Sequence, residues 1–303
     1  MRSLIILIVI SVSLFSCKTI TLDDEQVIAD IPEGLELVKI PAGAYSAGET
    51  AKIKFLDYDY LIMKYPVTNL QYIEYLKEAS KNGDIIITSQ CVTGYYKGDK
   101  NWPASINEFV DFDDPDSRIG FNPPDEFVIK WNWFGGRKEG YDNHPVTEVT
   151  WFGATAFAEY YGMRLPTKEE WEKAARANSK NDYPWGNTLS PSYANYKDSG
   201  DEYDNGTTPV GYYNGLGNTN NSYSPYGIYD MAGNVWEWTS SWWRDSSGKV
   251  IKGGSWNSLK RSGIDTDEIY VYDLLIWFEL FIGYLPTNSS REIGFRCIKD
   301  IEK

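Results

Sequence analysis

Residues 164–178, RLPTKEEWEKAARAN, carry the strongest local folding signal in the chain. Thr167 stands where a helix N-cap would stand, and Glu170 follows three residues later, which is the capping-box pattern. The two side chains can then bond backbone N–H groups that the first helical turn leaves without partners. The pattern predicts a helix that begins after Thr167, with Trp171 facing the interior.

Periodicity predicts further regular elements on either side. Residues 146–151, VTEVTW, are typical of a strand, and residues 151–162, WFGATAFAEYYG, of a helix with small residues that permit close packing. An earlier apolar stripe predicts another helix, which Thr68 or Asn69 can cap.

The segment between these helices, residues 84–143, is rich in Pro, Gly and Asp and shows little periodicity. We expect long loops there, packed by aromatic side chains. No Gly/Ser linker divides residues 35–303, and no fixed-period repeat is visible. The mature protein is therefore expected to form one α+β domain with short strands and many loops.

Composition limits the class of partner. The chain has 43 acidic and 29 basic residues, a net charge of −14, so it repels phosphate backbones and anionic lipid surfaces. Nucleic-acid binding is therefore not expected. Acidity of this kind fits either a solvated exported surface or carboxylates gathered around hard cations, and composition does not separate the two.

The first residues predict export and a lipid anchor. Residues 1–16 join a charge at Arg2 to an apolar run that is too short to span a bilayer and is typical of a signal peptide. LFSC, ending at Cys17, resembles the bacterial lipobox, whose cysteine is acylated after cleavage. Residues 17–34 would then be a tether, and the protein would be anchored in the cell envelope, at the outer membrane or cell surface. The alternative is an ordinary signal peptide or an N-terminal anchor with an incidental cysteine.

The remaining cysteines and the single histidine restrict metal chemistry. Cys91 and Cys297 either pair or are two buried thiols, and sequence leaves both possible. His144 is the only imidazole, which excludes a centre that needs two or three. Its place just before a proline favours structural hydrogen bonding.

One block combines carboxylates with a glycine turn. Asp230 and Glu237 flank it, and the carbonyl groups of Gly233 and Val235 can point the same way. Two carboxylates with carbonyl oxygens suit a hard cation such as Ca²⁺.

Several separated stretches, in one order and spanning residues 35–299, together resemble the formylglycine-generating enzyme, or sulfatase-modifying factor, family. They are LVKIPAGAYSAGE, YPVTNLQYIEYL, HPVTEVTWFGATAFAEYYGMRLPTKEEWEKAAR, YPWGN, YGIYDMAGNVWEWTSSWW, VIKGGSW and IGFRC. The resemblance implies a variant of the C-type lectin fold, in which short antiparallel sheets and a few helices pack around a loop-rich face.

The resemblance also implies two structural calcium sites. Family positions that bind calcium match Asp230, Gly233, Val235 and Glu237, although the family usually has Asn at the first. A second site would fall on Asn195, Tyr196, Glu202 and Asp204, where Asp198 and Asp201 compete for the same role. The alternative for the second set is a solvated acidic loop.

The copper pattern of the family is missing. Its oxidases bind copper through two cysteines after the GGS-aromatic strand, and those positions are Ser258 and Gly263 here. A hydroxyl group and a hydrogen atom cannot replace soft thiolates for Cu(I). The resemblance therefore implies no copper cofactor and no conversion of a substrate cysteine to formylglycine.

Residues 257–293 form the predicted recognition segment. The chain also resembles variable surface proteins of diversity-generating retroelements, in which the segment between GGSW and GFR is diversified. An apolar run inside it marks a binding patch if exposed and a core element if buried, and the charges of Asp273 and Glu279 favour exposure. The predicted ligand-binding residues are Asn257, Ser258, Tyr270, Tyr272, Trp277, Phe278, Glu279 and Phe281.

Three functions stay open at this point. We expect a non-catalytic lipoprotein that binds a protein or glycan at the cell surface. The alternative is a periplasmic oxidoreductase of the same family with non-copper chemistry near Ser258, Arg261 and Arg296. A third possibility is an envelope-structural lipoprotein with no soluble ligand.

Overall fold

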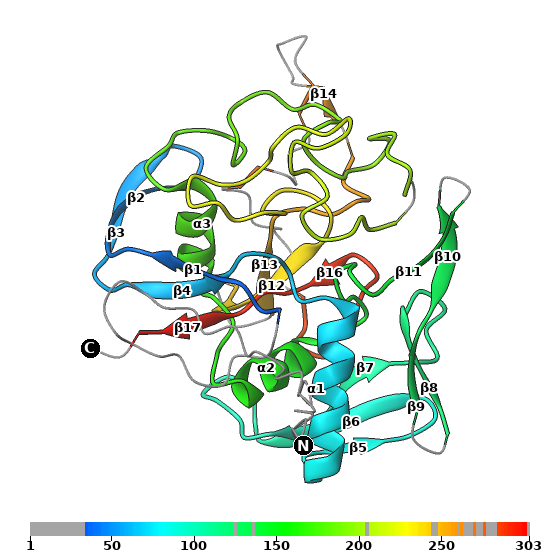
Figure 1. The fold of residues 1–303 in the computed structure, drawn as a ribbon. Helices are drawn as coiled ribbons and strands as arrows, with labels where there is room; N and C mark the ends of the chain where they lie inside the picture. Colours follow the sequence, from blue (N-terminus) through cyan, green and yellow to red (C-terminus); the bar gives the residue numbers. More distant parts are fainter. Residues whose placement is uncertain are drawn as a thin grey trace, which may run out of the picture. The chain divides into compact units, whose positions relative to one another are not determined.

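The computed structural model describes residues 34–123, 126–134, 137–203, 206–243, 248–259, 261–262, 269–270, 275–276 and 284–301 (Figure 1). The chain divides into Met1–Leu35 and Glu36–Lys303, and the fold described below is that of the second part. In the described residues, no helix is both long enough and apolar enough to span a membrane.

The described residues contain three helices and a set of short strands, so the α+β prediction is confirmed (Figure 1). The helices are α1 (Asn69–Asn82), α2 (Trp151–Tyr160) and α3 (Lys168–Arg176). The longest described strands have seven residues. Between α3 and the next strand at residue 236, the described residues form neither helix nor strand, which gives the domain its loop-rich side.

Two three-stranded sheets form the centre of the fold. One has the order β1-β4-β17 and is antiparallel, with β1 (Leu37–Ile40), β4 (Tyr60–Met63) and β17 (Ile298–Asp300). The other has the order β13-β12-β16, with β12 (Trp236–Trp242), β13 (Lys249–Lys252) and β16 (Ile293–Gly294). β12 pairs antiparallel with β13 and parallel with β16, so the end of the chain completes both sheets.

The other strands form smaller sheets. A third three-stranded sheet is β5-β6-β7, from β5 (Ile85–Ile87), β6 (Cys91–Tyr96) and β7 (Ser105–Asp111). The two-stranded pairs are β2 (Gly43–Ala47) with β3 (Lys52–Leu56), β8 (Ile119–Asn122) with β9 (Glu126–Ile129), β10 (Trp131–Phe134) with β11 (Arg137–Gly140), and β14 (Arg261–Ser262) with β15 (Ile269–Tyr270). In Figure 1 the β5-β6-β7 sheet lies beside α1, which contacts β5 and β9.

The N-caps of α1 and α3 agree with the sequence predictions. Thr68, not Asn69, caps α1 and forms a capping box with Gln71, and Gly83 ends the helix with φ +78°. Thr167 and Glu170 form the predicted capping box of α3. These bonds join residues three positions apart, so local sequence is enough to specify them.

Two predictions about local structure are wrong. Residues 146–150 form no regular strand and make only an isolated bridge, Val110 with Val149, before α2 begins at Trp151. Residues 84–143 are not long loops, because β5 to β11 fall in that range. These strands are short and are paired by hairpin partners, and Pro, Gly and Asp in the intervening turns conceal their alternation.

α3 supplies the centre of the main core. Trp171 is fully buried, as predicted, and packs with Ile40, Tyr60 and Ile62 of the β1-β4-β17 sheet. Full burial of one such side chain contributes about 1.5–3 kcal/mol. Through Trp171, α3 therefore packs against β1 and β4.

We predict that Thr167→Ala lowers the free energy of unfolding by about 0.5–2 kcal/mol, because the N-cap bond to Glu170 is lost. Urea denaturation measures it. Thr50→Ala, at an exposed turn position, is the control and should change stability by less than about 0.5 kcal/mol. Equal effects of the two substitutions would contradict the capping interpretation.

Candidate functional site

The candidate site is built on the β13-β12-β16 sheet, where β13 leads into GGSW. Gly253 and Gly254 have φ angles of +99° and +74°, a conformation that other residues rarely adopt. A Cβ atom at Gly253 would lie 3.1 Å from the ring of Trp171. Both glycines are therefore needed for the chain to turn closely over α3.

The two ends of the predicted recognition segment meet at the carboxylate of Glu292. Ser255 Oγ donates to Glu292 Oε2 at 2.7 Å, and Asn257 Nδ2 donates to Glu292 Oε1 at 2.9 Å. Trp256 Nε1 donates to the carbonyl of Arg291 at 3.2 Å, and the Arg291 guanidinium lies 5.0 Å from the Trp256 ring centre. Side-chain bonds thus join the two ends of residues 257–293 to each other at the base of the segment, next to the ends of β13 and β16.

Ser258 belongs to this base and is 3% exposed. Its hydroxyl accepts the backbone N–H of Ser255 at 3.0 Å, and its own N–H donates to the Ser255 carbonyl at 3.1 Å. The atom at the first copper-ligand position of the family is therefore a hydroxyl oxygen used in a turn. Gly263, the second position, lies outside the described residues.

The middle of the segment is attached to the core. Leu275 is 2% exposed and packs with Tyr183, Tyr196 and Ala232, while Ile276 is fully buried and donates its N–H to the Asp182 carbonyl at 3.0 Å. The prediction that the apolar run is exposed is wrong at these two residues, because the loops around them bury both side chains.

The structure describes little else of the predicted contact surface. Tyr270 lies in β15, and its side chain is outside the described set. Predicted residues wholly outside it are Tyr272, Trp277, Phe278, Glu279 and Phe281, together with Cys17.

The first predicted calcium set contains a buried ion pair. Arg296 and Glu237 are both fully buried and bond bidentately: Nη2 donates to Oε1 at 2.6 Å and Nε donates to Oε2 at 2.7 Å. Trp171 Nε1 also donates to Oε2, at 2.7 Å. The Glu237 carboxylate therefore already has three donors and an adjacent positive charge.

Arg296 also bonds the backbone around that set. Its Nη2 donates to the carbonyls of Tyr229 and Asp230, at 2.9 and 3.3 Å, and its Nη1 to those of Met63 and Lys64. Burial raises the pKa of Asp230 to about 6, and Gly211 N–H donates to its Oδ2 at 2.6 Å. The guanidinium supplies the positive charge that the prediction assigned to calcium, so the set fits a second cation poorly.

The two predicted calcium sets meet in space. Asn234 N–H donates to the Asn195 carbonyl at 2.9 Å, and a Cβ at Gly233 would collide with that same oxygen. Asn195 and Tyr196 are buried, whereas Glu202 is exposed and Asp204 lies outside the described residues. No group of three or more His, Cys, Asp or Glu side chains within the described ranges could hold a metal ion. Calcium binding stays a prediction.

The thiols and the imidazole are in ordinary environments. Cys91 and Cys297 are both free thiols, and burial raises the pKa of Cys297. His144 Nδ1 lies 3.0 Å from Thr207 Oγ1, and burial lowers the pKa of the imidazole to about 4. His144 is thus a buried, hydrogen-bonded and neutral residue, as its sequence context predicts.

Sequence reasoning missed Glu292 and the pairing of Arg296 with Glu237. Glu292 immediately precedes β16, and no local pattern marks its partners, which are 35 and 37 residues away. A carboxylate next to the IGFRC block was the one signal present in the sequence.

The family follows from these features together with direct comparison. The sulfatase-modifying factor enzyme 1-like domain matches residues 27–301. The chain belongs to this family, and its α+β fold is a C-type lectin-like fold of the formylglycine-generating-enzyme type.

The relatives include proteins named as active and as inactive. The chain is 37% identical over 167 residues to the inactive C-alpha-formylglycine-generating enzyme 2 of Bos taurus, covering 50% of this chain and 49% of that protein. It is 28% identical over 316 residues to the formylglycine-generating enzyme of Bos taurus, covering 88% and 75%. The chain spans about half or less of the first curated relatives it matches.

A solved structure of a bacterial protein supports the fold alone. PvdO from Pseudomonas aeruginosa covers 88% of this chain and 94% of its own, with 18% identity and a TM-score of 0.54. Treponema denticola variable protein 1 covers 88% and 95%, with 19% identity and a TM-score of 0.45. Genetic diversification of residues 257–293 stays a prediction.

We predict that Arg296→Met lowers the free energy of unfolding by about 3–5 kcal/mol, because Glu237 would remain buried without its counter-charge. Urea denaturation measures the change. Arg291→Met is the control, since Arg291 is 46% exposed and its ion pair with Asp116 should contribute about 1 kcal/mol or less.

A double variant separates the charge from the packing. Arg296→Met with Glu237→Leu removes both charges, and its stability should lie closer to wild type than that of Arg296→Met alone. If Arg296→Met cost no more than Arg291→Met, the structural role of the pair would be refuted.

Proposed function

We propose that the protein is a lipid-anchored envelope protein that binds a protein or glycan through residues 257–293 and does not catalyse copper-dependent oxidation. The observation that carries the proposal is the closed base of this segment. Glu292 joins Ser255 and Asn257, and the hydroxyl of Ser258 lies where the family's first copper thiolate would be needed.

A closed base suits recognition because a loop fixed at both ends keeps its position when its interior residues differ. Leu275 and Ile276 add an attachment to the core midway along the segment. Tyr and Trp side chains in such a segment are typical anchors of a binding surface, because they bury large areas at small entropic cost.

Copper chemistry has little support from the residues present. Cu(I) binding by the family's pattern needs two thiolates, and the free thiols of the mature chain lie elsewhere, at Cys91 on β6 and at buried Cys297. The fully buried thiol is also held in its neutral form by its raised pKa. One relative, 37% identical over 167 residues, is named an inactive formylglycine-generating enzyme. Its name supports the proposal that the family's domain also occurs without the oxidase reaction.

The binding proposal predicts that alanine at Tyr270, Tyr272 and Trp277 together reduces binding of the purified protein to whole cells and extracellular matrix by at least about tenfold, the scale of a lost hot spot. Biolayer interferometry and cell-binding assays measure it. The matched control is alanine at Ile86, Tyr95 and Ile106, which are exposed apolar residues on the β5-β6-β7 sheet.

Unchanged binding in the first triple variant would refute the role of residues 257–293. Oxygen consumption on candidate peptides by purified protein that holds no copper would instead support the enzyme alternative. Capture of envelope partners by both triple variants, with no binding to cells or matrix, would support an envelope-structural role.

The anchor proposal predicts that Cys17→Ala moves the protein from the detergent phase to the aqueous phase in a Triton X-114 partition of expressing bacteria. It should also abolish incorporation of labelled palmitate, because no other residue would be acylated. Ser16→Ala, which keeps a small residue before the cysteine, is the control and should leave both readouts unchanged. Labelling that persists in Cys17→Ala would contradict the lipobox prediction.

A further inference from the structure

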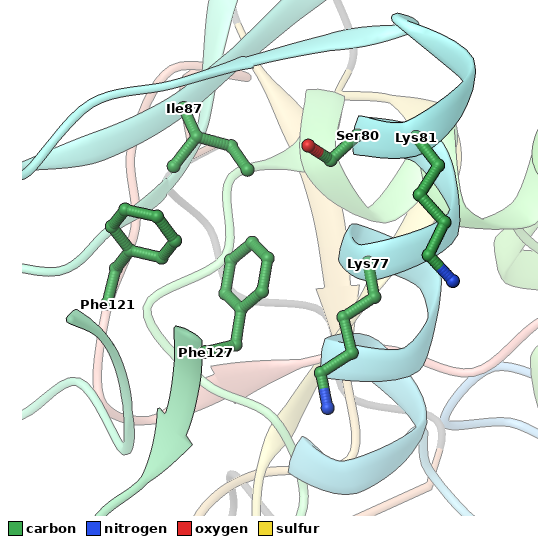
Figure 2. A pocket seen from close by; sticks show the side chains of 6 residues that line it. All are labelled: Lys77, Ser80, Lys81, Ile87, Phe121 and Phe127. Atoms are coloured by element: carbon green, nitrogen blue, oxygen red, sulfur yellow. The ribbon is translucent and has the colours of Figure 1, made fainter. Parts of the chain in front are cut away.

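A cavity of about 210 Å³ lies between α1 and the strands β5, β8 and β9. Its lining comes from Lys77, Ser80 and Lys81 of the helix and from Ile87, Phe121 and Phe127 of the strands (Figure 2). None of these residues belongs to 257–293 or to the predicted calcium sets. The cavity is therefore a feature separate from the candidate site.

One wall of the cavity is apolar and fixed. Phe121 and Phe127 are direct cross-strand partners in the β8-β9 pair, with ring centres 5.2 Å apart. The centre of the Phe112 ring lies 6.2 and 6.1 Å from the centres of these two rings. Figure 2 shows Ile87 and both rings on the side opposite α1, so a ligand would meet an aromatic and aliphatic surface there.

The other wall carries positive charge. Ser80 and Lys81 follow Lys77 by three and four residues, so each lies beside Lys77 on the surface of α1. Lys81 forms an exposed ion pair with Glu78 at 2.6 Å, whereas Lys77 makes no ion pair with any residue of the described ranges. Because Glu78 already compensates the charge of Lys81, Lys77 carries the charge on this wall that a ligand anion would pair with.

We propose that this cavity binds a small amphipathic carboxylate. Its apolar body lies on Phe121, Phe127 and Ile87, and its carboxylate group pairs with the ammonium group of Lys77, with Ser80 as a further donor. The cavity volume is below the ~300–1,000 Å³ of pockets for drug-sized ligands, so the ligand is the size of benzoate or a short-chain fatty acid.

The test uses benzoate and hexanoate as probes and the purified protein, with binding followed by saturation-transfer and chemical-shift NMR. Benzylamine and hexylamine are the matched probes, because they keep the apolar bodies and reverse the charge. The carboxylates should bind in the millimolar range, and the amines should bind more weakly. Amines that bind as tightly as carboxylates, or carboxylates that do not bind at all, would overturn the proposal.

Variants locate the binding to the cavity. Lys77→Gln should weaken benzoate binding by about two- to fivefold, the range for a solvent-accessible ion pair. Lys77→Glu should reverse the preference toward benzylamine. Lys52→Gln, at an exposed position of β3, is the control and should leave all affinities unchanged.

Ser80→Trp fills the cavity from an exposed helix position and should abolish binding while circular dichroism stays that of wild type. Ile87→Trp serves as a second blocking variant from the opposite wall. If both blocked variants fold and still bind benzoate with wild-type affinity, the ligand is elsewhere and the proposal fails. If Lys77→Gln leaves the benzoate affinity unchanged, Lys77 does not pair with the carboxylate and the proposal fails.

Discussion

The buried pair of Arg296 and Glu237 is the interaction on which the centre of this fold depends. Through one guanidinium group it joins β12 to the link between β16 and β17, to the end of β4 and to the loop at Tyr229. A loop-rich domain has few ladder bonds to hold such segments in place. Hydrogen bonds from the buried Arg296 guanidinium hold these segments in place instead. Burying the two charges of the pair costs desolvation free energy.

The same region supports the proposed recognition segment. Trp171 of α3 donates a hydrogen bond to Glu237, and its ring packs closely against Gly253. The turn at the start of GGSW is therefore in contact with a side chain that bonds the buried pair. From that turn, Ser255 and Asn257 reach Glu292, which precedes β16. The core therefore sets the position of the segment's two ends, and Leu275, Ile276 and Tyr284 attach its interior to the core and to β13.

The helices could be predicted closely and the strands could not. Capping boxes at Thr68 and Thr167 act over three residues, so their physics is contained in the local sequence. The strands β5 to β11 depend on hairpin partners and on aromatic packing, and residues 84–143 therefore gave no clear periodicity. Leu275 and Ile276 are a similar case, since only the surrounding loops decide whether an apolar run is buried.

The sequence by itself determined the helix starts, the family, and the chemistry of a hydroxyl and a glycine at the positions where the family's oxidases carry thiolates. Residue identity decides these properties, whatever the surroundings. The tertiary structure decided that Glu237 bonds Arg296 and that Glu292 closes the recognition segment. It also brought α1 and the β8-β9 pair around one cavity. Arg296 bonds a carbonyl 233 residues away, and contacts over such separations are set by the folded chain as a whole.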